Sequence, residues 1–113
     1  MADCIFCKII LGEIPSQKVY EDELVYAFND INPMAPVHIL VVPKQHIPTL
    51  LDVNSSNSNL VAHIYEVITK IAKEFNLEDG FRVVSNCNEN GCQTVFHIHF
   101  HILGGQKLSD QMA

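Results

Sequence analysis

The chain has 113 residues, of which 48% are hydrophobic, and it carries a formal net charge of −6 at pH 7. This length allows one buried core and leaves no room for a second, so we expect a single domain over residues 1–113. The acidic balance argues against nucleic acid and against an anionic membrane surface as partners, because both bind clusters of Lys and Arg.

The N-terminal segment predicts a short helix and no targeting signal. Apolar residues recur at helical spacing in CIFCKIILG, and the pattern ends at Gly12. The segment has no long apolar stretch with a cleavage site, and no run in the chain approaches the ~20 apolar residues of a membrane span. We therefore expect a cytoplasmic or nuclear protein, whose cysteines are thiols or metal ligands and not disulfides.

Residues 18–43 predict three strands. KVYED and LVYAFND flank an acidic turn at residues 21–23, a pattern typical of a hairpin. The following INPMAP predicts a loop. VHILVVP, residues 37–43, is a β-branched apolar run, and its ladder should end at Pro43 because proline has no N–H to donate.

One long amphipathic helix follows this strand. LDVNSSNSNL, residues 51–60, is rich in residue types that cap helix N-termini. Apolar residues then repeat at steps of three and four through residues 59–76. They are Leu60, Ile64, Val67, Ile68, Ile71 and Phe75.

The last part of the chain predicts two further strands. GFRVVSN, residues 80–86, has the composition of a strand, and CNENGC predicts a loop. Residues 94–105 predict the last strand, which Gly104 and Gly105 end. Together the segments indicate an α+β fold: an antiparallel sheet of about five strands, one long helix on a sheet face, and a short N-terminal helix.

The last predicted strand carries three histidines at alternate positions, in TVFHIHFHILGG. Alternate residues of a strand project to the same face, so His97, His99 and His101 should line one face. At ~3.3 Å per residue His97 and His101 lie roughly 13 Å apart, too far for one metal ion with bonds of ~2.0 Å to bind both. We therefore do not expect a three-histidine zinc site on this strand.

Imidazole is suited to two-step transfer of a phosphorus group. With an ordinary pKa near ~6.5 it is largely neutral at pH 7, so it can attack phosphorus, leave again or pass a proton. The preceding loop, NENGCQT, offers glycine, a Thr hydroxyl and backbone N–H groups to a phosphoryl group. A solvated row of histidines is the alternative, and three in register beside an apolar face argue against it.

Two segments resemble one known family. QTVFHIHFHILGG is similar to the signature of the histidine triad (HIT) family, and FNDINPMAPVHILVVPKQHI resembles that family's other core segment. The resemblance runs from Cys4 to Gly105 and is greatest to the Hint branch of purine nucleoside phosphoramidases. It implies a HIT-like fold and hydrolysis of purine nucleoside 5′-phosphoramidates through a nucleotidyl-histidine intermediate. It further implies AMP or GMP as product, no cofactor for catalysis, and a homodimer whose sheets join across the interface.

The resemblance also implies roles for individual residues. His99 would be the nucleophile, His101 would contact the phosphate and help to protonate the leaving amine, and His97 and His38 would support them. Polar residues would hold the nucleotide: Asn86, Gln93 and Thr94 at the phosphate, and Asp30 at the ribose hydroxyls. Apolar residues would form the walls around the base: Ile5, Phe6, Ile9, Phe28 and Ile31. Ordinary core packing is the alternative for each of these apolar side chains.

Two departures from the Hint pattern affect the expected activity. Cys92 stands where Hint proteins usually have glycine, which should restrict the loop backbone. The tail QKLSDQMA lacks the aromatic and proline-rich ending of animal Hint proteins, so the leaving group stays open. A dinucleoside polyphosphate hydrolase like the Fhit branch is one alternative, disfavoured because LGG and not a Pro-Arg pair follows the histidines. A non-catalytic nucleotide-binding adaptor is the other, and the complete triad argues against it.

Cys4 and Cys7 form a Cys-x-x-Cys pair whose chemistry the sequence leaves open. The pair could be a redox couple, two inert thiols or half of a zinc site, and its place at the start of the chain disfavours the redox couple. His46 and His97 occupy positions that resemble the zinc ligands of some bacterial family members. Two thiolates and two imidazoles would make a structural zinc site. In the metal-free alternative His97 only orients its neighbour.

Overall fold

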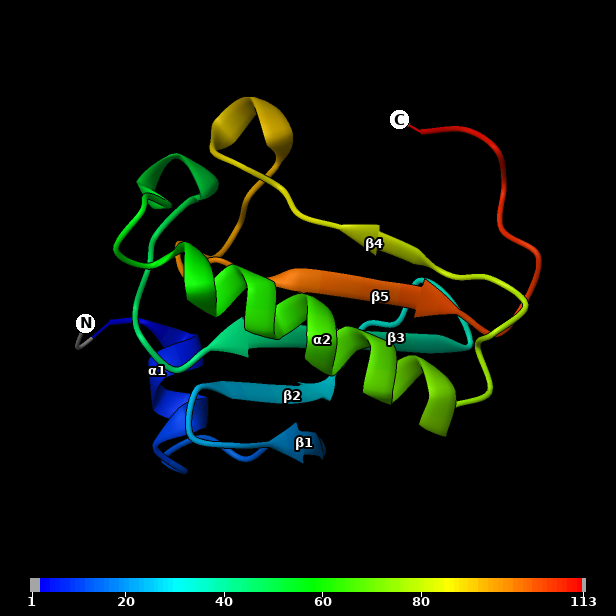
Figure 1. The fold of residues 1–113 in the computed structure, drawn as a ribbon, viewed down its shortest axis with the longest axis horizontal. Coiled ribbons are helices and arrows are strands. Elements are labelled where there is room, and N and C mark those ends of the chain that lie inside the picture. Colours follow the sequence, from blue (N-terminus) through cyan, green and yellow to red (C-terminus); the bar gives the residue numbers. More distant parts are fainter. Residues whose placement is uncertain (1–2, 113) are drawn as a thin grey trace.

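A five-stranded antiparallel sheet forms the centre of the fold (Figure 1). In chain order its strands are β1 (Lys18–Glu21), β2 (Val25–Asn29), β3 (Val37–Pro43), β4 (Arg82–Val84) and β5 (Phe100–Gly104). In space their order is β1-β2-β3-β5-β4. The helices are α1 (Ile5–Ile10) and α2 (Ser58–Glu74), and short 3-10 turns lie at Leu50–Asp52 and Glu89–Gly91. The computed structural model describes residues 3–112 and confirms the predicted α+β fold with one long and one short helix.

The central strands have two apolar faces, and a helix covers each one. Odd-numbered residues of β2 and β3 belong to the core under α2, which lies across the sheet in Figure 1. Even-numbered residues of the same strands pack with Phe6 and Ile9 of α1. Because successive side chains of a strand point to opposite faces, this alternation places α1 and α2 on opposite sides of the sheet.

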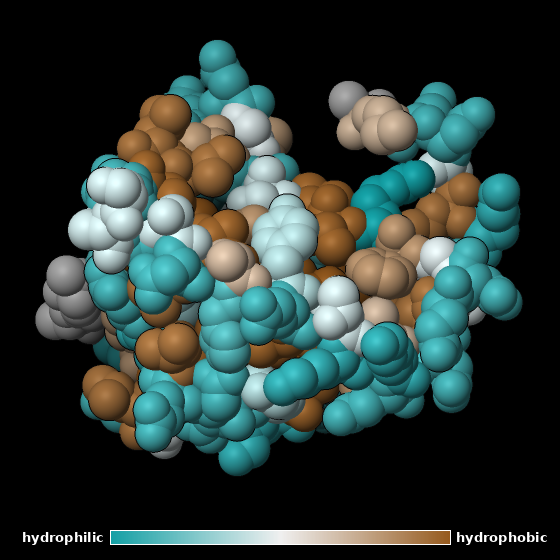
Figure 2. Space-filling model, in the orientation of Figure 1, coloured by the Kyte–Doolittle hydropathy of each residue, from teal (hydrophilic) through white to brown (hydrophobic). Residues whose placement is uncertain are grey.

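The helix α2 buries the predicted apolar stripe, with one exception at its end. Leu60, Ile64, Val67, Ile68 and Ile71 are all buried against the sheet. Phe75 lies just past the last helical residue, where it caps the helix and is 37% exposed. Polar side chains cover much of the surface on the α2 side (Figure 2). Within residues 3–112 no helix has both the length and the apolar character that a membrane crossing requires.

The last strand is shorter than predicted, which corrects the expectation of a strand through residues 94–99. β5 begins at Phe100, paired with Val41 of β3. Continuing this register would bring Ile98 opposite Pro43, which has no N–H to donate, and the chain bends at residues 95–97 instead. Of the three histidines only His101 therefore lies on the strand. β4 is likewise shorter than the predicted residues 80–86.

Candidate functional site

His101 and His38 meet on the face of the sheet that α1 covers. His38 Nε2 lies 2.9 Å from His101 Nδ1 and 3.4 Å from a carboxylate oxygen of Asp30. The backbone N–H of Met34 donates to His38 Nδ1 at 3.0 Å, so a neutral His38 carries its proton on Nε2 and donates it to His101. The single proton of a neutral His101 is then on its own Nε2. A chain of hydrogen bonds thus determines the tautomer of His101.

Backbone carbonyls orient the other two histidines. His99 Nδ1 donates to the carbonyl of His97 at 2.8 Å, and His97 Nε2 donates to the carbonyl of Pro43 at 2.7 Å. In each neutral ring the remaining nitrogen therefore carries a lone pair. His99 presents an unprotonated Nε2, which is the form that can attack phosphorus. His97 presents an unprotonated Nδ1.

Burial keeps these four rings neutral at pH 7. It lowers the pKa of His97 to about 4, although the hydrogen bond to Pro43 opposes the shift. It also lowers the pKa of His101 to about 4, and the neighbouring histidines add to the effect. The pKa values of His99 and His38 are lowered by burial too, against the charge of Asp30. The nucleophilic form of imidazole is therefore favoured here.

A pocket of about 260 Å³ opens beside these rings, between α1 and the sheet. It brings together nine of the residues predicted to bind a nucleotide: Ile5, Phe6, Ile9, Phe28, Asp30, Ile31, Thr94, His99 and His101. Most of the lining is apolar, as in typical small-molecule sites, and the polar side chains in it include Asp30, Thr94, His99 and His101. Phe6 forms one wall and packs edge-on against His99, with ring centroids 5.0 Å apart. Ile31 is 90% exposed and lies at the rim.

Sequence reasoning missed six further lining residues: Ile14, Pro15, Ser16, Asn29, Leu40 and Val95. Leu40 could have been found, because it shares the β3 face with His38 by simple alternation. The loop residues Pro15 and Ser16 had no comparable signal, since tertiary packing alone brings them to the pocket.

Two amide side chains predicted at the phosphate lie in the adjoining loop and do not line the pocket. Gln93 is buried, donates both amide hydrogens to backbone carbonyls at 2.8 and 3.0 Å, and accepts a bond from the N–H of Asn88. Asn86 donates to the carbonyl of Gly91 at 2.7 Å. In this arrangement both amides brace the loop, and their contact with a phosphate stays a prediction.

The same loop contains a residue in a conformation that favours glycine. Cys92 has φ of 62° and lies in the left-handed region. A side chain in that region crowds the following carbonyl at a cost of roughly 1–2 kcal/mol. The expected restriction of the loop at Cys92 thus takes the form of backbone strain at this residue.

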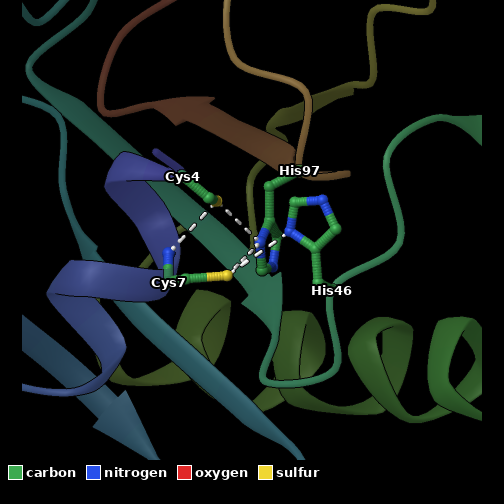
Figure 3. Close-up of side chains that lie close together, drawn as sticks. All are labelled: Cys4, Cys7, His46 and His97. Atoms are coloured by element: carbon green, nitrogen blue, oxygen red, sulfur yellow. Dashed lines mark hydrogen bonds between the residues drawn. The ribbon is translucent and has the colours of Figure 1, made fainter. Parts of the chain in front are cut away.

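Four side chains from three separate segments of the chain form a cluster next to Phe6, which packs against His97. Cys4, Cys7, His46 and His97 have their donor atoms within 4.8 Å of one another. Figure 3 shows the thiols of Cys7 and of Cys4, at the N-terminus of α1, converging with the two imidazoles. The Sγ atom of Cys7 lies 3.4 Å from His46 Nδ1 and 3.5 Å from His97 Nδ1, and Cys4 Sγ lies 3.4 Å from His97 Nδ1.

This geometry and these donor types fit a zinc ion. Ligands at tetrahedral corners with bonds of about 2.0–2.3 Å lie roughly 3.3–3.8 Å apart, which matches the sulfur–nitrogen distances. The His97 nitrogen that faces the thiols is the unprotonated one, and its other nitrogen donates to the Pro43 carbonyl. A metal-bound histidine usually has such a partner on its other nitrogen.

The thiols do not have the character of a redox couple. Burial, together with the hydrogen bond and charge of Cys4, raises the pKa of Cys7 to about 11. Reactive cysteines have lowered pKa values, because the thiolate is the nucleophile. The two imidazoles beside the thiols, which a redox pair does not need, favour a metal site over a redox pair.

Comparisons with known proteins find one family along most of the chain. The HIT domain family matches residues 11–108. A purine nucleoside phosphoramidase of Escherichia coli is 46% identical over 112 residues, covering 98% of this chain and 94% of that protein. A 14 kDa zinc-binding protein of Zea mays is 48% identical over 107 residues, covering 93% of this chain and 84% of that protein. The structure of a histidine triad protein from Clostridium difficile matches with a TM-score of 0.95 and 56% identity, over 98% of this chain and 97% of that one.

Proposed function

Because the chain belongs to the HIT domain family, we propose that it hydrolyses purine nucleoside 5′-phosphoramidates and releases AMP or GMP. The observation that carries the proposal is the state of His99, a buried ring that donates Nδ1–H to a carbonyl and presents a free Nε2 at the pocket. The similarity to the Escherichia coli phosphoramidase supports the choice of substrate.

The pocket suggests how the nucleotide binds. The base packs against Phe6, Ile9 and Phe28, where stacking and burial of apolar surface stabilise it. The ribose hydroxyls donate to Asp30, and the phosphate lies at His99 and His101 beside Thr94. This orientation points the leaving amine away from the apolar end of the pocket.

The reaction then takes two steps. His99 Nε2 attacks phosphorus, a nitrogen–phosphorus bond forms to His99, and the bond to the amine breaks as the amine takes a proton delivered through His101 Nε2. Water next attacks the same phosphorus and returns a proton to His101, and the bond to His99 breaks. AMP or GMP and the free enzyme result. Two displacements at phosphorus need a nucleophile that is also a fair leaving group, which imidazole is.

A covalent-intermediate experiment tests this function. The protein is mixed with adenosine 5′-phosphoramidate, quenched in base to preserve the phosphorus–nitrogen bond, and digested for mass spectrometry. AMP attached to the peptide that contains His99 is the expected result. Faster turnover of a diadenosine polyphosphate would favour the Fhit-like alternative, and AMP binding without turnover of either substrate would favour the adaptor.

A structural zinc ion at Cys4, Cys7, His46 and His97 completes the proposed description. The ion would cross-link α1 to the segment before β5 and supply no catalytic chemistry, because its ligands are not those that face the phosphate. The zinc-binding relative from Zea mays supports this assignment. Metal analysis of protein purified without a His-tag should find about one zinc per chain.

The proposed assembly is a homodimer. The sheet order makes β1 and β4 the edge strands, and Phe81, which directly precedes β4, is 38% exposed. Exposed strand edges and apolar side chains are commonly covered by a partner. The apolar stripe of α2 adds nothing to this argument, because it is buried in its own core. Sedimentation velocity at micromolar concentration should show one species of twice the chain mass, and a monomer would contradict the assembly.

A further inference from the structure

The segment that carries the nucleophile has few backbone constraints of its own. Residues 94–99 lie outside the strand ladder, and within them the backbone N–H of Ile98 donates to the carbonyl of Ile47 at 2.7 Å. The side chain of His97 anchors the same segment through its hydrogen bond to the Pro43 carbonyl. The backbone carbonyl of His97 in turn accepts the hydrogen bond from Nδ1 of His99. The position of His99 therefore depends on His97.

The helix α1 depends on the same cluster. It has only six residues, and only Phe6 and Ile9 of these are buried. A helix of this length is not stable by itself in water, because nucleation is unfavourable and few backbone bonds follow. Further contacts with the body of the protein come from the thiols of Cys7 and of Cys4, the N-cap residue, which face His46 and His97 (Figure 3).

Phe6 joins the cluster to the pocket. It stands between Cys4 and Cys7 in the sequence, and its ring packs edge-on against His97 at 6.0 Å, His99 at 5.0 Å and Phe28 at 5.6 Å between centroids. One side chain thus contacts a proposed ligand of the cluster, the proposed nucleophile and Phe28, an adjoining wall of the pocket. A change in the position of α1 must move a wall of that pocket.

From these contacts we propose that the metal cluster and the nucleotide pocket are coupled through α1. Zinc bound by Cys4, Cys7, His46 and His97 increases the affinity for AMP, and AMP increases the affinity for zinc by the same factor. The inference rests on the proposed nucleotide-binding function and adds to it that the four ligands are positioning residues for the base pocket and His99.

The physical cause is a shared ordering cost. Zinc holds α1 and the segment before β5 in the arrangement that binds the base, so AMP no longer has to order them. Conversely, AMP packed against Phe6 and Ile9 holds the two thiols where zinc requires them. Coupling between two binding equilibria is reciprocal by thermodynamic necessity.

Titration of AMP into the full chain tests the coupling without any measurement of turnover. Zinc-loaded protein and protein stripped by a chelator are compared by calorimetry at a temperature where circular dichroism shows both to be folded. Zinc should lower the Kd of AMP by about fivefold or more, within the range typical of coupled sites. The Kd of zinc, from competition with a chromophoric chelator, should fall by the same factor when AMP is saturating.

Two variants separate coupling through α1 from a general gain in stability. Phe6→Leu retains all four ligands and should bind zinc, but zinc should change its AMP affinity much less than in the wild type. Ile64→Ala lowers stability from the core under α2, away from α1, and should retain the full coupling factor.

Each outcome bears on the inference. Equal AMP affinity with and without zinc would overturn it and leave the proposed hydrolase intact. An undiminished zinc effect in Phe6→Leu, or its loss in Ile64→Ala, would overturn the route through α1. Absence of AMP binding in both forms of the wild type would overturn the proposed function together with the inference.

Discussion

Replacing His38 by alanine should lower turnover by a moderate and calculable factor. The substitution removes the Nε2–H that donates to His101 Nδ1 at 2.9 Å, so His101 is free to carry its proton on Nδ1. That tautomer has no proton on Nε2 for the leaving amine. A polar atom left without its partner in a half-buried site costs ~1–3 kcal/mol, which corresponds to a ~5- to 150-fold loss in kcat.

The other histidines set the scale for this loss. His101→Ala removes the proton donor itself and should lower kcat by ~10²- to 10⁴-fold. His99→Ala removes the covalent route and should abolish turnover while leaving AMP binding. The expected order of damage is therefore His38, then His101, then His99.

Steady-state release of AMP from adenosine 5′-phosphoramidate measures this series, with kcat and KM determined separately. His63→Ala is the matched control, because His63 bonds to Asp22 at 2.7 Å outside the pocket and should leave kcat unchanged. A His38→Ala variant as inactive as His99→Ala, or as active as the wild type, would refute the tautomer argument. A His99→Ala variant with a tenth of the wild-type activity would refute the covalent mechanism.

Three further predictions concern stability. The double variant Cys4→Ser, Cys7→Ser should clearly lower the Tm measured with zinc present but should change kcat at saturating substrate little. An unchanged Tm in calorimetry would argue against a structural metal. His101 has a folded pKa of about 4 against an ordinary 6.5, so the unfolded chain binds its proton first as the pH falls. The contribution of His101 to the free energy of unfolding should therefore be level above pH 7 and fall below pH ~6.5 by up to ~1.4 kcal/mol per pH unit, and His101→Gln should reduce the total slope by this amount in urea titrations. Cys92→Gly should raise the free energy of unfolding by ~0.5–1 kcal/mol through relief of the left-handed backbone, whereas Cys92→Ala should not, and a loss of stability in the glycine variant would contradict the strain.

The elements of the fold were predictable because their signals are local. The period of α2, the apolar run of β3 and the acidic hairpin turn each reside within a few consecutive residues, and the structure has all three. Phe75 departed from the pattern because periodicity cannot tell the last helical turn from the cap that follows it. The residues expected to bind a nucleotide came from the resemblance, and nine of them line one pocket.

The sequence by itself determined the types of side chain, their alternation and the two short motifs that contain the histidines and cysteines. The tertiary structure decided which of them meet. The register of β3 with β5 ends the ladder at Phe100, so that His97 turns toward Cys4, which lies 93 residues away in the chain, while His101 stays on the strand beside His38. Proton positions on the rings likewise depend on carbonyls and N–H groups from other segments. Such partners are set by packing over long sequence separations, which local patterns do not encode.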